Sequence, residues 1–111
     1  MSDTGVKYPA NASSTAVAPY DDNDWTNVDY ARADDTAYAY ITAASYDTSD
    51  YSYLIKVYGF DFSAIPDGAT IDGVLVEVLA WTTAGSGDYA CVRLLDSSRD
   101  LTGDNKGGNT L

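Results

Sequence analysis

The chain has 111 residues, which suits one domain and is too short for two domains with separate cores. Seventeen acidic residues against six basic ones give a formal net charge of −11, which disfavours nucleic acid and anionic membrane surfaces as partners. No apolar run approaches the roughly 20 residues of a membrane span, and the first residues lack the basic start and apolar stretch of a signal peptide.

The composition favours β-structure over helix. Sixteen of the seventeen acids are aspartates, which favour turns and caps, and Glu77 is the one glutamate. Tyrosine occurs ten times, and Thr, Ser, Val and Gly are frequent. This composition is typical of strands joined by Asp/Gly/Ser turns.

Residues 1–35 are weakly patterned, and we interpret them as an extended N-terminal arm with an acidic loop and one short strand at residues 15–18. The loop reads Asp-Asp-Asn-Asp over residues 21–24. The alternation of Asp22, Asp24 and Thr26 is similar to the start of a calcium loop. It lacks the glycine at the sixth position and the bidentate glutamate at the twelfth. We therefore favour a solvated loop and expect that no metal is needed.

Residues 36–111 carry the β-pattern and end in a polar, Gly-rich tail. We predict strands over residues 36–42, 53–62, 71–81 and 89–96, with a loop at 43–50 and a hairpin connection at 82–88. The element Ile65-Pro66-Asp67-Gly68 predicts a turn, because proline presets its backbone angle and glycine accepts a positive φ.

The clearest of these patterns is the segment 71–81. Its even positions are uniformly apolar, so we expect Val74, Val76 and Val78 to face a core together with Val92 and Leu94 of the return strand. Glu77 would then lie on the outer face opposite Arg93.

These strands predict an all-β fold, an antiparallel β-sandwich. Four strands make one sheet, and the apolar face of that sheet must be covered. A closed sandwich usually needs about seven strands. We therefore expect a sandwich that is incomplete as it stands or is completed by a neighbouring chain, and an isolated chain that does not remain a monomer.

The residues that carry chemistry are sparse. The chain has no histidine, so imidazole catalysis and His-ligated metals are excluded. Cys91 is the one cysteine and is interpreted as a small buried hydrophobe in a strand. Acidic residues occur in every predicted turn, and the sequence does not indicate which two of them would form a catalytic pair. We predict no catalytic residues, no cofactor and no enzymatic activity.

The tyrosines are the candidate binding residues. Three interpretations stay open: half-buried strand residues, a protein interface, or a glycan-binding face. The candidates, six tyrosines within about twenty residues and one tryptophan, are Tyr38, Tyr40, Tyr46, Tyr51, Tyr53, Tyr58 and Trp81.

Residues 54–78, LIKVYGFDFSAIPDGATIDGVLVEV, resemble a block common in bacteriophage structural proteins. In that block a strand ending in a Phe-Gly-Phe-like element runs into Ile-Pro-x-Gly-Ala-x-Ile-x-Gly-Val and then a strand of alternating aliphatics. Shorter matches extend the resemblance over roughly residues 20–107: Trp25-Thr26-Asn27, Asp35-Thr36-Ala37-Tyr38-Ala39, Val92-Arg93-Leu94 and Gly103-Asp104-Asn105-Lys106.

The resemblance implies a β-sandwich, often jelly-roll-like, in a tail fibre, a baseplate attachment or a capsid decoration protein. It implies a virion location after assembly in the host cytoplasm, with other virion proteins and copies of the chain itself as partners. The family's chain continues beyond the Asn-Lys element with further strands, so the resemblance also implies either a longer protein or strands supplied by neighbours. The alternative function is a carbohydrate-binding module that recognises a host-surface glycan through the tyrosines.

Overall fold

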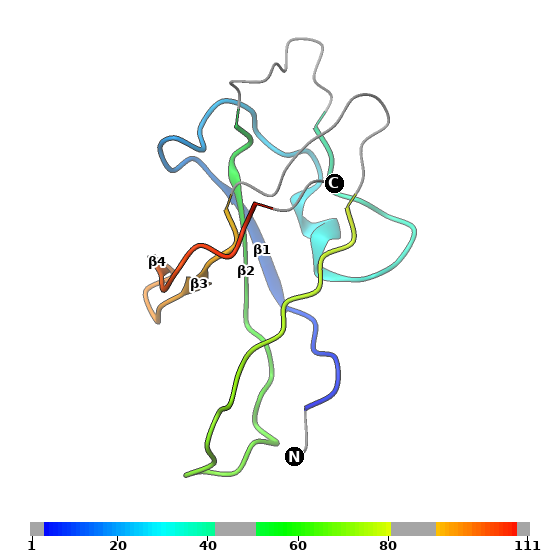
Figure 1. Ribbon diagram of the computed structural model, residues 1–111. Coiled ribbons are helices and arrows are strands. Elements are labelled where there is room, and N and C mark those ends of the chain that lie inside the picture. Colours follow the sequence, from blue (N-terminus) through cyan, green and yellow to red (C-terminus); the bar gives the residue numbers. More distant parts are fainter. Residues whose placement is uncertain (1–3, 42–50, 81–90, 109–111) are drawn as a thin grey trace.

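The computed structural model describes residues 4–41, 51–80 and 91–108, and it is extended rather than compact (Figure 1). The radius of gyration is 15.2 Å, against about 13 Å for a compact domain of this length. The elements in chain order are β1 (Asn11–Thr15), the 3₁₀ helix η1 (Val28–Arg32), β2 (Leu54–Tyr58), β3 (Leu94–Leu95) and β4 (Leu101–Thr102).

β1 and β2 form the longer of two antiparallel ladders. Their register runs from Asn11 opposite Tyr58 to Thr15 opposite Leu54. β2 is rich in branched and aromatic residues that suit a pleated, half-buried surface. Beyond it, Gly59 has a φ of +81°, and its carbonyl accepts a hydrogen bond from the Ala10 amide at 3.3 Å.

β3 and β4 form a short hairpin, with Leu94 opposite Thr102 and Leu95 opposite Leu101. Asp96 holds the intervening turn, since its Oδ1 accepts hydrogen bonds from the amides of Ser98 at 2.8 Å and Asp100 at 3.1 Å. β3 lies within the strand predicted at 89–96, whereas no strand was predicted at β4.

Arg99 joins the hairpin turn to the longer sheet. Its guanidinium lies 4.0 Å from the centroid of the Tyr58 ring. Its carbonyl oxygen accepts a hydrogen bond from Lys56 Nζ at 2.8 Å. Two contacts thus attach the turn between β3 and β4 to β2.

The region that was expected to be an extended arm is tied to the longer sheet. β1 lies at residues 11–15, earlier than the strand expected at 15–18. Trp25 Nε1 donates to the Tyr53 carbonyl at 2.8 Å, and Arg32 Nη1 donates to the Ala10 carbonyl at 2.8 Å. These bonds hold the segment around η1 against both strands.

The predicted β-sandwich is wrong. The described residues contain two sheets of two strands each, and none of these residues is buried. A sandwich needs two multi-stranded sheets that bury their inner faces against each other. Two short ladders without a core cannot form a sandwich. The prediction of a jelly-roll-like arrangement is therefore wrong as well. No helix in the described part of the chain is long and apolar enough to cross a membrane.

The individual strand predictions have mixed outcomes. The strand at 53–62 is confirmed in its first half as β2, and within the described part of the strand predicted at 89–96 only β3 forms. Residues 36–41 form no strand and contribute one bridge, between Tyr40 and Thr26. Residues 71–80 form no strand either. The loop predicted at 43–50 and the connection at 82–88 lie outside the described residues.

The structure has a turn after β2 one residue later than the predicted one, at residues 66–69 instead of 65–68. The Ala69 amide donates to the Pro66 carbonyl at 3.1 Å, and Gly68 has a φ of +79°. The positive φ is the conformation for which glycine was expected at this position.

Candidate interaction surface

The described surface has an open pocket of about 620 Å³. Three segments enclose it: the chain after the turn at residues 66–69, the chain around β3, and the chain after β4. Its aliphatic lining consists of Val74, Val76, Val78, Val92 and Leu94, and its other lining residues are Gly73, Arg93, Gly103, Asp104 and Lys106. The five aliphatic residues are the ones expected to share one apolar face, and the structure brings them around one pocket.

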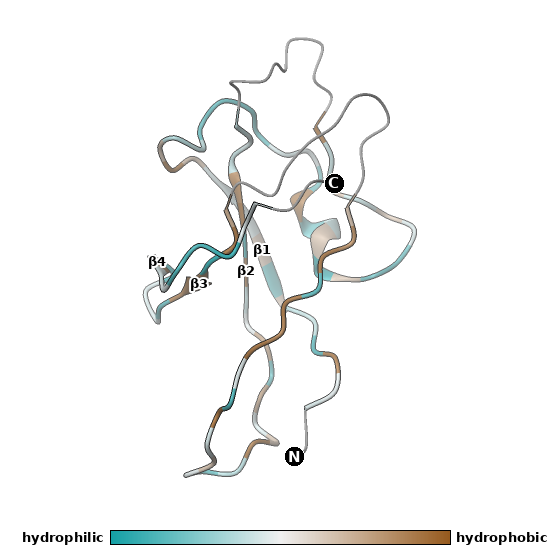
Figure 2. Ribbon diagram, viewed as in Figure 1, coloured by the Kyte–Doolittle hydropathy of each residue, from teal (hydrophilic) through white to brown (hydrophobic). Residues whose placement is uncertain are grey.

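The segment 71–80 presents apolar side chains to solvent on both of its faces. Figure 2 shows much of this segment in the colour of hydrophobic residues. Its large aliphatic residues are between 54% and 84% exposed: Ile71, Val74, Leu75, Val76, Val78 and Leu79. Monomeric soluble proteins rarely expose a contiguous apolar patch of this kind.

The backbone of this segment is also unpartnered. Within the described part of the chain, no backbone hydrogen bond involves residues 71–80. An extended segment with free N–H and C=O groups on both edges is a template for strand addition.

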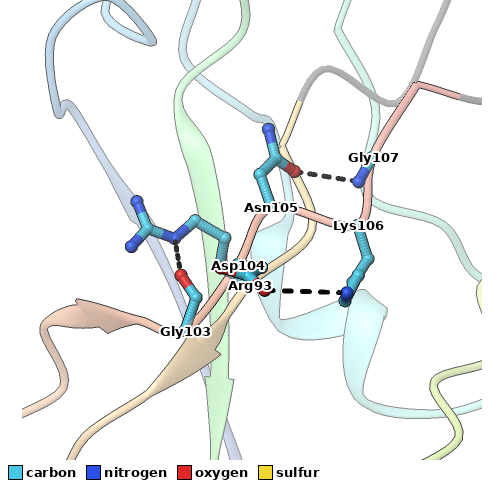
Figure 3. A network of polar contacts seen from close by, with 6 residues as sticks. All are labelled: Arg93, Gly103, Asp104, Asn105, Lys106 and Gly107. Carbon is cyan, nitrogen blue, oxygen red and sulfur yellow. Dashed lines mark hydrogen bonds and ion pairs between the residues drawn. The ribbon is translucent and has the colours of Figure 1, made fainter.

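Asn105 fixes the opposite wall of the pocket. Its Oδ1 accepts hydrogen bonds from the Val92 amide at 2.9 Å and from the Gly107 amide at 2.8 Å. The Lys106 amide donates in turn to the Val92 carbonyl at 2.8 Å. One side chain thus joins the chain before β3 to the chain after β4. Figure 3 shows its bond to Gly107.

The same wall carries charged groups. Arg93 Nε donates to the Gly103 carbonyl at 3.1 Å, and Lys106 Nζ lies 3.9 Å from Asp104 Oδ2 (Figure 3). The predicted pair between Glu77 and Arg93 is wrong, because the expected strand ladder that would place them opposite each other does not form. Among the described residues, the one ion pair is Lys106 with Asp104.

The candidate tyrosines lie in different environments. Tyr38, Tyr40 and Tyr51 are 44%, 47% and 39% exposed. The Tyr51 ring makes an edge contact with Tyr20, at 5.4 Å between centroids and 87° between planes. Tyr58 lies under the Arg99 guanidinium.

Of the three remaining candidates, one lies within the described residues and two lie outside them. Tyr53 is half-buried and connects by its backbone to Trp25 and to Asn23. Tyr46 and Trp81 lie outside the described residues. An interface or glycan role for the tyrosines stays a prediction.

The acidic loop makes contacts within the fold. Asp22 Oδ2 accepts a hydrogen bond from the Tyr51 amide at 2.7 Å, and Asp24 Oδ1 accepts one from the Ser14 hydroxyl. In the described part of the chain, no group of three or more acidic or cysteine side chains is close enough to hold a metal ion. The expectation that no metal is needed stays a prediction.

Tyr20 lies beside Cys91 and has a perturbed pKa. Burial raises the pKa of its phenol, and the neighbouring Cys91 thiol raises it further. Cys91 is half-buried, so the expectation of a fully buried cysteine is not met.

The Tyr20 environment predicts a loss of stability at alkaline pH. A folded-state pKa above the unfolded value stabilises the fold below about pH 10, and this contribution is lost as pH rises through the folded pKa. Unfolding curves across this range should decline more steeply for the natural chain than for Tyr20→Phe. Cys91→Ala should return the Tyr20 pKa part of the way to its ordinary value, as measured by ultraviolet titration. A Tyr20→Phe chain with an unchanged alkaline decline would contradict the assignment.

Asn105 and Arg99 are the structural residues that the sequence did not single out for these roles. Asn105 lies in a Gly-rich stretch, and Arg99 lies in an Asp/Ser turn. Both residues contact segments that are distant in sequence, and no local pattern predicts such contacts. The one local signal here is the Asp/Ser stretch around Arg99, which indicates a turn.

Comparison of the chain with protein-family models, with curated proteins and with solved structures found no match.

Proposed function

We propose that the chain is a non-enzymatic structural protein of a bacteriophage virion that lies on the particle surface and acts through protein–protein assembly. The observation that carries the proposal is the segment 71–80, whose six large aliphatic side chains are more than half exposed. A protein with such a segment is normally covered in an assembly. The resemblance of residues 54–78 to phage structural proteins is the reason for proposing a virion as that assembly.

The charge of the chain supports a position on the outside of the particle. The formal net charge of −11 would be repelled by packaged nucleic acid, whereas an outer surface carries no such penalty. The side chains support a non-enzymatic role, since the chain has no histidine. Capsid decoration proteins and tail or fibre components both fit these properties.

The alternative is a carbohydrate-binding module. The exposure of Tyr38 and Tyr40 favours it, because exposed aromatic rings can stack on sugars. The engagement of Tyr51 by Tyr20 and of Tyr58 by Arg99 favours it less, because those ring faces are partly used within the fold. Assembly is therefore the better-supported function.

The test is the composition of particles produced from the genome that encodes the chain. Gradient-purified particles should contain the chain in a fixed ratio to a major capsid or tail protein, and an antibody against the chain should bind intact particles. Absence from purified particles would overturn the virion role, and antibody binding only after disruption would overturn the surface location. Glycan-array binding that is lost in Tyr38→Ala and Tyr40→Ala, by a chain absent from particles, would establish the alternative.

A further inference from the structure

We propose that residues 71–80 are a self-assembly strand, and that two copies of the chain pair these segments antiparallel about a two-fold axis at Val76. This inference rests on the proposed assembly function and names the surface and the partner. The segment lacks backbone partners on both edges and exposes aliphatic side chains on both faces. An antiparallel second copy supplies a hydrogen-bond ladder and apolar contacts together.

The sequence of the segment is compatible with a two-fold axis at Val76. In that register Val76 lies opposite its own copy, and Val74 lies opposite Val78. The three valines of the segment that line the pocket then pair with valines, which is a favourable cross-strand combination on one face. Glu77 lies opposite Leu75 of the second copy, so no like charges face each other.

The neighbouring registers are less favourable. An axis at Glu77 would place this carboxylate opposite its own copy, and like charges directly opposite are destabilising. An axis at Leu75 would place Asp72 opposite Val78 and so insert a carboxylate among the valines. The Val76 axis moves Asp72 to the end of the ladder, opposite Ala80.

The charge near the segment is small compared with that of the whole chain. Each copy carries −11 overall. The pocket beside the segment is lined by Arg93, Lys106 and Asp104, and the segment itself adds Asp72 and Glu77, so two cations and three acids give a local charge of −1. Most of the repulsion between two copies therefore acts at long range. Salt screens long-range repulsion, so the dimer should become several-fold tighter between about 0.05 M and about 0.5 M salt.

The area of the paired segments is that of a weak dimer. Full coverage of one aliphatic side chain removes on the order of 100 Å² of apolar surface, so the six side chains at their observed exposure offer at most about 400 Å² per copy. A second strand at one edge covers only part of this surface, so two copies bury less than about 800 Å², below the roughly 1,000 Å² of a specific interface. We therefore expect a reversible dimer with a dissociation constant in the micromolar range or weaker.

Cysteine cross-linking tests the pairing and its register in the full chain, with Cys91→Ser removing the native thiol. Val76→Cys should form a disulfide-linked dimer on oxidation, because Cα atoms of directly opposed residues lie about 4.5–5.5 Å apart. Val74→Cys alone should not, since the two copies of residue 74 would lie about 13 Å apart. A mixture of Val74→Cys and Val78→Cys chains should cross-link.

Sedimentation supplies an independent measurement. Val76→Lys should weaken the dimer at least tenfold, because it places two ammonium groups at the axis. Val6→Lys is the matched control, since Val6 is also an exposed valine, at 68%, and should leave the dissociation constant unchanged. Circular dichroism should show that Val76→Lys keeps the fold, because this side chain is already more than half exposed.

Each result separates the pairing from the virion role. A Val76→Cys cross-link with the mixed Val74–Val78 cross-link supports the proposal, and cross-linking at Leu75→Cys instead overturns the register. A chain present in purified particles that cross-links at none of these positions overturns the self-pairing and leaves the virion role standing. A chain that cross-links through Val76→Cys but is absent from particles leaves the self-pairing standing and overturns the virion role.

Discussion

Replacing Gly59 with alanine should lower the free energy of unfolding by about 1–3 kcal/mol, because two separate penalties act at this position. The residue has a φ of +81°, a conformation that L side chains rarely adopt. An added Cβ would also lie 2.9 Å from Asn11 Nδ2 and 3.1 Å from the Ala10 Cβ. The hydrogen bond from the Ala10 amide to the Gly59 carbonyl fixes the backbone here, so the strand ends cannot separate without losing it.

Gly73→Ala is the matched control for this change. A Cβ on Gly73 meets no atom within 4 Å. Its substitution should therefore leave stability within about 0.5 kcal/mol or raise it slightly, since alanine restricts the unfolded chain. Urea unfolding followed by tryptophan fluorescence compares the two. Adding Asn11→Ala to Gly59→Ala should recover the part of the loss caused by Asn11 Nδ2, and neither the contact with the Ala10 Cβ nor the backbone part. A greater loss from Gly73→Ala than from Gly59→Ala would show that the end of the β1–β2 ladder is not fixed as described.

Local sequence signals identified the parts of the fold that are locally determined. β2 was predictable, because residues 54–58 are mostly branched or aromatic. The turn that contains Gly68 was predictable from proline and glycine chemistry. Both elements depend on a few adjacent residues, which is the range over which sequence patterns carry information.

The strand predicted at 71–81 failed because alternation indicates which side chains share a face and says nothing about a ladder partner. A strand exists only when a second segment pairs with it, and residues 71–80 have no such segment in the described chain. β1 shows the reverse case. Its sequence, Asn-Ala-Ser-Ser-Thr, has little strand propensity, and its pairing with β2 makes it a strand. The sandwich prediction failed for the same reason, because it counted apolar patterns as paired strands.

The candidate surface could be predicted in its apolar half and not in its polar half. The apolar residues at even positions predicted that Val74, Val76 and Val78 share one face, and the structure places them around one pocket. The polar wall depends on Asn105 reaching Val92 across thirteen positions of sequence, a contact that no local pattern signals.

Replacing Asn105 with alanine should open this polar wall and lower the free energy of unfolding by about 1–2 kcal/mol. The change removes the acceptor of two backbone hydrogen bonds, from Val92 at 2.9 Å and from Gly107 at 2.8 Å, and each such bond contributes about 0.5–1.5 kcal/mol. The segment after β4 would then be held to Val92 only by the Lys106 amide. Urea unfolding measures the loss of stability.

Asn105→Asp is the matched control, because it keeps an acceptor oxygen at the same position and should be less destabilising than alanine. Amide hydrogen exchange gives a local measurement, since the Val92 and Gly107 amides should lose protection in Asn105→Ala and retain it in Asn105→Asp. Protection that persists in the alanine variant would show that the Lys106–Val92 bond alone holds the wall. Equal losses of stability in the two variants would show that the side chain acts through its amide nitrogen and not through the oxygen that the two amides share.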